Sequence, residues 1–184
     1  MKLFICSDIH GDAAALEKVL ALYDASGAER LILLGDLLYH GPRNDLPAGY
    51  APKEVIRLLN ARKSQILAVR GNCEAEVDQM VLDFPVLADY AWLCPDAGVR
   101  IFVTHGHHYN TETPPPLCPG DILLHGHTHL PGVTPFGKDN VYLNPGSTSI
   151  PKGGFPASYM LYEDSVFTIL SLSGEVLFTH TAKR

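Results

Sequence analysis

Short apolar runs that end in polar clusters recur along this chain. Five runs of three or four residues are almost continuously apolar, which is the pattern of strands buried on both faces. They are Leu3–Cys6, Leu31–Leu34, Ile66–Val69, Ile101–Thr104 and Ile122–Leu124. The polar clusters that follow are Asp8-Ile9-His10, Gly35-Asp36, Gly71-Asn72, His105-Gly106 and Gly126-His127-Thr128-His129. The pattern predicts buried strands that present polar side chains at their carboxyl ends.

The segments between the first strands have the spacing of helices. Apolar residues recur at helical intervals over Asp12–Asp24, and Asp12 is a suitable N-cap. Further helices are predicted over Pro52–Ala61, with Pro52 in the first turn, and over Glu74–Leu82. Beyond Tyr90 short strands alternate with turns, at Val99–Thr104, Asp121–Leu124, Val141–Leu143, Ser158–Leu161, Ser165–Leu172 and Glu175–His180. This order predicts an α/β fold with two packed sheets and helices outside.

The polar clusters offer carboxylate, amide and imidazole groups, all of which bind divalent metal ions. Such groups at the ends of several strands of one sheet can converge on a single crevice. Asp8 and His10 are two residues apart at a strand end, so both can reach one ion. The carboxylate of Asp36 has two oxygens and can bridge two cations roughly 3.5–4 Å apart. Nitrogen and oxygen donors without thiolate favour Mn, Fe, Co, Ni or Zn over Ca, and we expect Mn first.

Composition and charge narrow the class of protein. With 184 residues, of which 46% are hydrophobic and 18% charged, the chain fits one domain over residues 1–184. The net charge of −6 disfavours a broad nucleic-acid-binding face, which depends on many lysine and arginine contacts with phosphate. No apolar stretch approaches the roughly 20 residues that span a bilayer, and the chain leads straight into a strand instead of a signal peptide. We therefore expect a cytoplasmic protein with no membrane contact. The four cysteines show no paired CxxC spacing, and we expect them to be reduced thiols.

The ordered clusters resemble the calcineurin-like metallophosphoesterase superfamily. Its pattern is D-x-H, G-D, G-N-[H/D]-[D/E], a G-H or H-G element, and G-H-x-H. The resemblance extends to the small bacterial phosphodiesterases of that superfamily over essentially the whole length, through Leu34–Asp36, His40–Asn44, Val69–Cys73, Gly126–Pro131 and Asn144–Ser147. It implies a four-layer α/β/β/α sandwich with a dinuclear metal centre. One ion would be held by Asp8, His10, Asp36 and His129, and the other by Asp36, Asn72, His105 and His127.

The activity that this resemblance implies is hydrolysis of phosphodiester bonds. A hydroxide that bridges the two ions would attack phosphorus in line with the leaving group, without a covalent intermediate. One position departs from the pattern, because many relatives have a histidine after Gly-Asn and this chain has Cys73. The role of that histidine as proton donor therefore does not carry over to this chain. Cys73 can be a weak proton donor whose proton affinity the nearby cations alter, or a small thiol that fills space beside the site, and we favour the second interpretation.

Several assignments stay open at the level of sequence. Arg43 and His40, in the loop after Asp36, are candidates for contacts with a small phosphodiester substrate, whereas Arg70 can equally be structural. Lys152 can lie at the mouth of the site or at a subunit contact, and the long loops could support a homo-oligomer. Asn144-Pro145-Gly146-Ser147 either orients ligand groups or forms a rigid turn. The alternative functions are a phosphomonoesterase or nucleotidase on the same site, and a scaffold that has lost catalysis.

Overall fold

Two mixed β-sheets lie face to face in the structure, a computed structural model that describes residues 1–183. The first sheet has six strands in the order β11-β10-β9-β1-β2-β3, and the second has five in the order β4-β5-β6-β8-β7. In the first sheet the strands are β1 Leu3–Cys6, β2 Arg30–Leu33, β3 Ile66–Ala68, β9 Ser158–Glu163, β10 Val166–Ser171 and β11 Val176–Thr181. In the second they are β4 Tyr90–Leu93, β5 Ile101–Thr104, β6 Ile122–Leu124, β7 Gly132–Phe136 and β8 Asn140–Asn144.

The parallel strands of both sheets deliver their carboxyl ends to one edge of the sandwich. β1, β2 and β3 are parallel neighbours in the first sheet, and β5, β6 and β8 are parallel neighbours in the second. The other strands pair antiparallel at the sides of these blocks. Because parallel strands end on the same side, the loops that leave β1, β2, β3, β5 and β6 can meet.

The alternation of side chains along the first sheet divides the core in two. Leu3, Ile5 and Ile32 face the second sheet and pack with its buried residues Ile101 and Val103. The intervening residues face the other way, toward the helices; they are Phe4, Cys6, Leu31 and Leu33. Burial on both faces explains why these strands are apolar without alternation.

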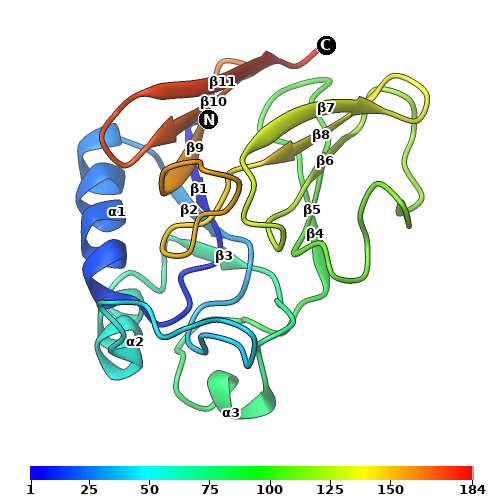
Figure 1. The fold of residues 1–184 in the computed structure, drawn as a ribbon. Coiled ribbons are helices and arrows are strands. Elements are labelled where there is room, and N and C mark those ends of the chain that lie inside the picture. The colour runs from blue at the N-terminus through cyan, green and yellow to red at the C-terminus, as the bar shows by residue number, and fades with distance from the viewer. Residues whose placement is uncertain (184) are drawn as a thin grey trace.

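The helices α1 (Ala13–Ser26) and α2 (Pro52–Asn60) lie side by side against the outer face of the first sheet (Figure 1). The Asp12 carboxylate caps α1 by accepting a hydrogen bond from the Ala15 amide at 2.9 Å, as predicted. Gly27 ends α1 in the left-handed conformation, with φ of 70°. Within residues 1–183 no helix combines the length and the apolar character needed to cross a membrane.

The α/β class with two mixed sheets is confirmed, but the second sheet carries no helix on its outer face within residues 1–183. Part of the loop between β5 and β6 lies there instead, with Tyr109 packed edge-on against Phe102 of β5. Pro114, Pro115 and Pro116 interrupt this loop, and a run of prolines cannot continue a helix. The fourth layer of the expected sandwich is therefore loop.

Two other differences from the predicted elements concern α3 and the edge strands. The helix expected over Glu74–Leu82 is wrong in extent, because only Glu76–Gln79 is helical and forms α3. The Glu74 side chain is buried and accepts hydrogen bonds from the amides of Asp36 and Leu37 in the loop after β2, and the helix begins only beyond it. β4 and β7 are additional strands at the two edges of the second sheet. Their half-exposed residues, and Pro135 in β7, hide the strand pattern in the sequence.

Candidate metal centre

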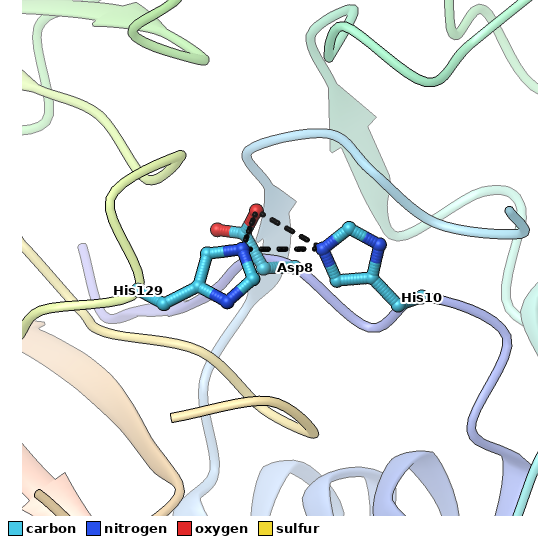
Figure 2. Close-up of side chains that lie close together, drawn as sticks. All are labelled: Asp8, His10 and His129. Atoms are coloured by element: carbon cyan, nitrogen blue, oxygen red, sulfur yellow. Dashed lines mark hydrogen bonds and ion pairs between the residues drawn. The ribbon is translucent and has the colours of Figure 1, made fainter. Parts of the chain in front are cut away.

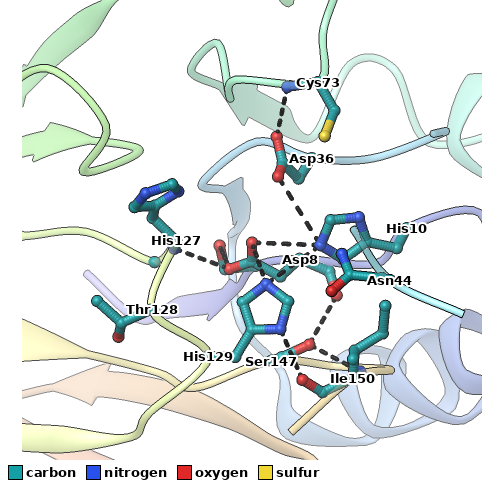
Figure 3. Close-up of polar contacts among 12 residues, drawn as sticks. Asp8, His10, Asp36, Asn44, Cys73, His127, Thr128, His129, Ser147 and Ile150 are labelled. Carbon is teal, nitrogen blue, oxygen red and sulfur yellow. Dashed lines mark hydrogen bonds and ion pairs between the residues drawn. The ribbon is translucent and has the colours of Figure 1, made fainter. Parts of the chain in front are cut away.

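The expected metal ligands come together where the parallel strands end. Figure 3 shows Asp8, His10, Asp36, His127 and His129 among them. Asp8 and His10 follow β1, and Asp36 follows β2. The other four come from the loops after β3, β5 and β6; they are Asn72, His105, His127 and His129. Side chains separated by as many as 121 residues therefore share one site, in which two groups can be distinguished.

The first group consists of Asp8, His10 and His129, all buried (Figure 2). The Nε2 atoms of His10 and His129 are 3.2 Å apart. The Asp8 Oδ1 atom lies 3.6 Å from the His10 Nε2 atom and 3.2 Å from the His129 Nε2 atom. Three potential ligand atoms thus surround one point.

The second group consists of Asn72, His105 and His127. The His105 Nε2 atom is 3.1 Å from the Asn72 Oδ1 atom and 3.2 Å from the His127 Nδ1 atom. His105 is fully buried, His127 is half-buried and Asn72 is exposed, so this group borders solvent. The two groups differ in formal charge as well, because the first has a carboxylate of its own and the second has a neutral amide in its place.

The Asp36 carboxylate lies between the two groups. Its Oδ2 atom is 3.8 Å from the His10 Nε2 atom and 3.5 Å from the His105 Nε2 atom. Its Oδ1 atom accepts a hydrogen bond from the Cys73 amide at 2.9 Å. The Oδ2 atom therefore faces both groups, and the backbone holds the Oδ1 atom. The sequence suggested only that the two oxygens of Asp36 can bridge two cations.

Backbone carbonyls orient three of the imidazoles. The Nδ1 atoms of His10, His105 and His129 lie 2.8, 2.6 and 2.6 Å from the carbonyl oxygens of Tyr39, Leu34 and Ile150. A carbonyl can only accept, so each Nδ1 atom must carry the proton and each neutral ring presents a bare Nε2 atom to the site. Metal-binding histidines commonly have their other ring nitrogen held by a hydrogen bond in this way.

The polar atoms of the first group are unsatisfied in a way that suits a cation. Two bare Nε2 atoms 3.2 Å apart cannot hydrogen-bond to each other, and the buried Asp8 Oδ1 atom has no hydrogen-bond partner. Burial disfavours ionisation of Asp8, yet the neighbouring imidazoles of His10, His129 and His105 hold the pKa of its carboxyl well below the ordinary value. Burial likewise works against a charged His105, but Asp36 and Asp8 raise its pKa to about 9. The site favours positive charge, and its residues fit divalent ions.

Left-handed backbone conformations point these side chains inward. Asp8, His10, Asp36, His127 and His129 have φ between 50° and 67°, a region that residues other than glycine rarely adopt. The backbone amides of Asp8 and His10 donate to the carbonyls of Gly35 and Asp36, at 3.1 and 2.9 Å. The surrounding structure therefore holds strained conformations in place at the site, as is common where function requires it.

The match to a known family decides what kind of protein carries this site. The model of the calcineurin-like phosphoesterase superfamily domain matches residues 1–165. The chain belongs to this superfamily. The family resemblance inferred from the ordered motifs is thereby confirmed.

Individual relatives agree with membership of the superfamily. Phosphodiesterase YfcE of Escherichia coli is 47% identical over 182 residues, which are 99% of this chain and 98% of YfcE. A solved structure of YfcE, described as a phosphoesterase, matches with a TM-score of 0.96 at 46% identity and covers 100% of both chains. An archaeal phosphodiesterase matches with a TM-score of 0.62 at 18% identity, over 96% of this chain and 100% of that one, and supports the fold alone.

Glu74 is a buried residue of the site that the sequence analysis missed. One carboxylate oxygen accepts a hydrogen bond from the Leu37 amide at 2.7 Å, and the other accepts bonds from the amides of Asp36, at 2.8 Å, and Gly71. Burial and the charge of Asp36 raise the pKa of Glu74 to about 7. Glu74 therefore ties the loop of Asp36 to the loop of Asn72. The acidic fourth position of the superfamily's G-N-[H/D]-[D/E] element was the signal that could have revealed it.

Replacing Glu74 by glutamine is expected to lower the free energy of unfolding by about 1–3 kcal/mol, because an amide nitrogen must then face a backbone N–H. Urea unfolding of the metal-free protein measures this. Glu76→Gln, at an exposed position in the first turn of α3, is the matched control. It should change the free energy of unfolding by only a few tenths of a kcal/mol. Equal losses in the two variants would show that Glu74 does not tie the loops together.

A cavity of about 430 Å³ opens onto the site and is lined by residues of several loops. Arg43 and Lys152 line it, as do Asn44 and Thr128. The His40 ring instead packs against the rings of Tyr39 and Tyr50.

Two more residues singled out in the sequence have defined places. The Arg70 guanidinium donates to the Glu74 carbonyl at 3.3 Å and does not line the cavity, so its contact is structural. Cys73 is half-buried and lines the cavity, and its thiol sulfur accepts a hydrogen bond from the Asn72 side chain at 3.2 Å. The thiol therefore occupies the place in the pattern where many relatives carry a histidine.

Proposed function

We propose that this chain is a metal-dependent phosphodiesterase that acts through a dinuclear centre. The observation that carries the proposal is the Asp36 Oδ2 atom, which faces the imidazoles of His10 and His105 at 3.8 and 3.5 Å. Asp8, His10 and His129 would complete the ligands of one ion, and Asn72, His105 and His127 would complete those of the other. The name of the relative YfcE, at 47% identity over nearly all of both chains, supports a diester as the substrate.

The groups of the site have different roles in hydrolysis. When bound, two divalent ions would activate a water molecule and offset the negative charge that develops on the phosphate. The protein holds the carboxylates and imidazoles in place through buried backbone hydrogen bonds. Arg43 and Lys152, in the lining of the cavity, are the cationic side chains that can bind the remaining phosphate oxygens and orient a small diester.

Manganese is the ion that we propose first, with Zn, Fe, Co and Ni as alternatives. The donors of the two groups are carboxylate oxygens, an amide oxygen and imidazole nitrogens. This mixed set suits these transition metals better than calcium, which takes oxygen ligands.

The leaving group is expected to need little protonation. Burial, together with the charge of Asp36, raises the pKa of the Cys73 thiol, so that it is a weak proton donor. Diesters whose leaving oxygen is a weak base, such as aryl diesters, should therefore react fastest.

Comparison of two aryl esters tests the proposed function. We expect bis(4-nitrophenyl) phosphate to be hydrolysed faster than 4-nitrophenyl phosphate in the presence of Mn²⁺. Chelation should abolish the reaction and added Mn²⁺ should restore it. Faster hydrolysis of the monoester would favour a phosphomonoesterase or nucleotidase. A protein that neither binds Mn²⁺ nor hydrolyses either ester would be a scaffold.

A further inference from the structure

The segment Asn144-Pro145-Gly146-Ser147 connects the two sheets at the edge that bears the metal ligands. Asn144 is the last residue of β8 in the second sheet, and the chain then returns to β9 in the first sheet. Asn144 and Ser147 are both fully buried. Their side chains contact ligand-bearing loops on opposite sides of the site.

Asn144 supports the loop that carries His127 and His129. Its Nδ2 atom lies within hydrogen-bond distance of the Gly126 carbonyl and the Thr128 hydroxyl, both at 2.9 Å, and of the Tyr142 hydroxyl at 2.7 Å. Its Oδ1 atom accepts a hydrogen bond from the Gly146 amide at 2.8 Å. Because the polar atoms of the Asn144 side chain are engaged by the protein, Asn144 acts on the loop and not on an ion.

Ser147 supports the loop that carries Asp8. The Ser147 hydroxyl donates to the Asp8 carbonyl at 2.9 Å (Figure 3). The Ser149 hydroxyl donates to the same oxygen at 3.1 Å. The Thr148 amide donates to the Ser7 carbonyl at 3.0 Å. These bonds hold the peptide that follows Asp8, whose φ is 57°.

The next residues of the same segment hold His129. The Ile150 carbonyl fixes the His129 ring through the Nδ1 atom at 2.6 Å, and the Lys152 amide donates to the His129 carbonyl at 3.2 Å. One continuous segment therefore contacts Asp8, which comes from the first sheet, and His129, which comes from the second.

We propose that Asn144 and Ser147 are positioning residues that set the distance between the ligands of the first sheet and those of the second. Metal affinity then depends on two side chains whose own contacts are with the protein. This inference rests on the proposed metal centre, because it concerns the geometry of that centre.

The strand β8 offers a matched control for Asn144. Asn140 begins the strand that Asn144 ends, and it is also buried. Its Nδ2 atom donates to the carbonyls of Cys118 and Asp121, at 2.7 and 2.9 Å, at the end of the sheet away from the ligands. Asn140→Ala and Asn144→Ala therefore remove the same side chain with similar bonds from the same strand.

The experiment compares Mn²⁺ affinity and thermal midpoint in the wild type and the two variants. Affinity is measured by competition with a chromophoric chelator, and stability on the metal-free proteins. Both variants should melt lower than the wild type. Only Asn144→Ala should lose Mn²⁺ affinity, by about 10–100-fold, as is typical when an outer partner of a metal ligand is removed. Equal affinity in the two variants would overturn the proposal.

A milder pair of variants covers the case in which Asn144→Ala fails to fold. Thr128 is exposed, so Thr128→Val should fold, but the valine side chain cannot accept the Asn144 hydrogen bond. Thr128→Ser retains the hydroxyl and should keep the Mn²⁺ affinity of the wild type, whereas Thr128→Val should weaken it. Valine and serine variants of equal affinity would contradict the role of Asn144. Failure of the wild type itself to bind Mn²⁺ would instead contradict the metal centre.

Discussion

Replacing Asp36 by asparagine is expected to weaken the binding of both metal ions at once while leaving the fold intact. The Cys73 amide should bind the oxygen of the new side chain, because it binds the Asp36 Oδ1 atom at 2.9 Å. The amide nitrogen of asparagine must then replace the Oδ2 atom, and a nitrogen that carries two protons cannot bind a cation. The same nitrogen can donate toward the bare imidazoles, so the metal-free protein should remain folded.

Metal analysis and steady-state kinetics measure the effect of Asp36→Asn. We expect both ions to bind far more weakly and kcat/KM for the aryl diester to fall on the order of 10³-fold. His129→Ala is the comparison, since it removes a ligand from the buried group alone and should empty mainly one site. If each variant lost one ion and kept the other, Asp36 would not be a shared ligand.

Replacing Gly71 by alanine is expected to disrupt the centre without touching a ligand side chain. A Cβ atom at Gly71 would lie 2.2 Å from the Asp36 Oδ1 atom, 2.5 Å from the Asp36 amide nitrogen and 2.6 Å from a Glu74 carboxylate oxygen. None of these atoms is the free end of a flexible side chain, because all three are held by hydrogen bonds. The two loops must therefore move apart.

The size of the Gly71→Ala effect follows from the cost of crowding a packed interior. The free energy of unfolding should fall by about 1–3 kcal/mol or more, and diester hydrolysis should be lost with the metal ions. Gly132→Ala is the control, because a Cβ atom there meets nothing within 4 Å. Urea unfolding and Mn²⁺ binding of both variants provide the comparison. A Gly71→Ala protein that behaves like Gly132→Ala would show that the loops are not tightly packed.

The positions of the ligands could be predicted because they follow a simple physical rule. Continuous apolar runs mark strands buried on both faces, and parallel strands place their carboxyl ends together. Asp8, Asp36 and His105 each follow such a run, and the structure brings them within reach of one another. The Asp12 cap could be predicted for a similar reason, since its hydrogen bond is local in sequence.

Features that depend on distant contacts could not be predicted from local patterns. Glu74 looks like the start of a helix, but it is bound to two amides of one loop more than 35 residues away as well as to Gly71. The choice of one Asp36 oxygen for both groups depends on the Cys73 amide, which spacing does not reveal. The edge strand β4 has half-exposed residues because it pairs on one side only, so it lacks the apolar signature of the inner strands.

The left-handed backbone at five ligand positions implies a trade-off between thermal stability and catalytic activity. Such a conformation costs a residue other than glycine roughly 1–2 kcal/mol, and a whole domain is stable by only about 5–15 kcal/mol. The folded chain carries this cost with or without bound ions, so the ligand side chains are already oriented in the metal-free protein. Directed evolution for survival at high temperature alone would be expected to bring glycine into positions such as His10 and His127. The resulting protein would have higher thermal stability but would lack metal ligands and therefore activity.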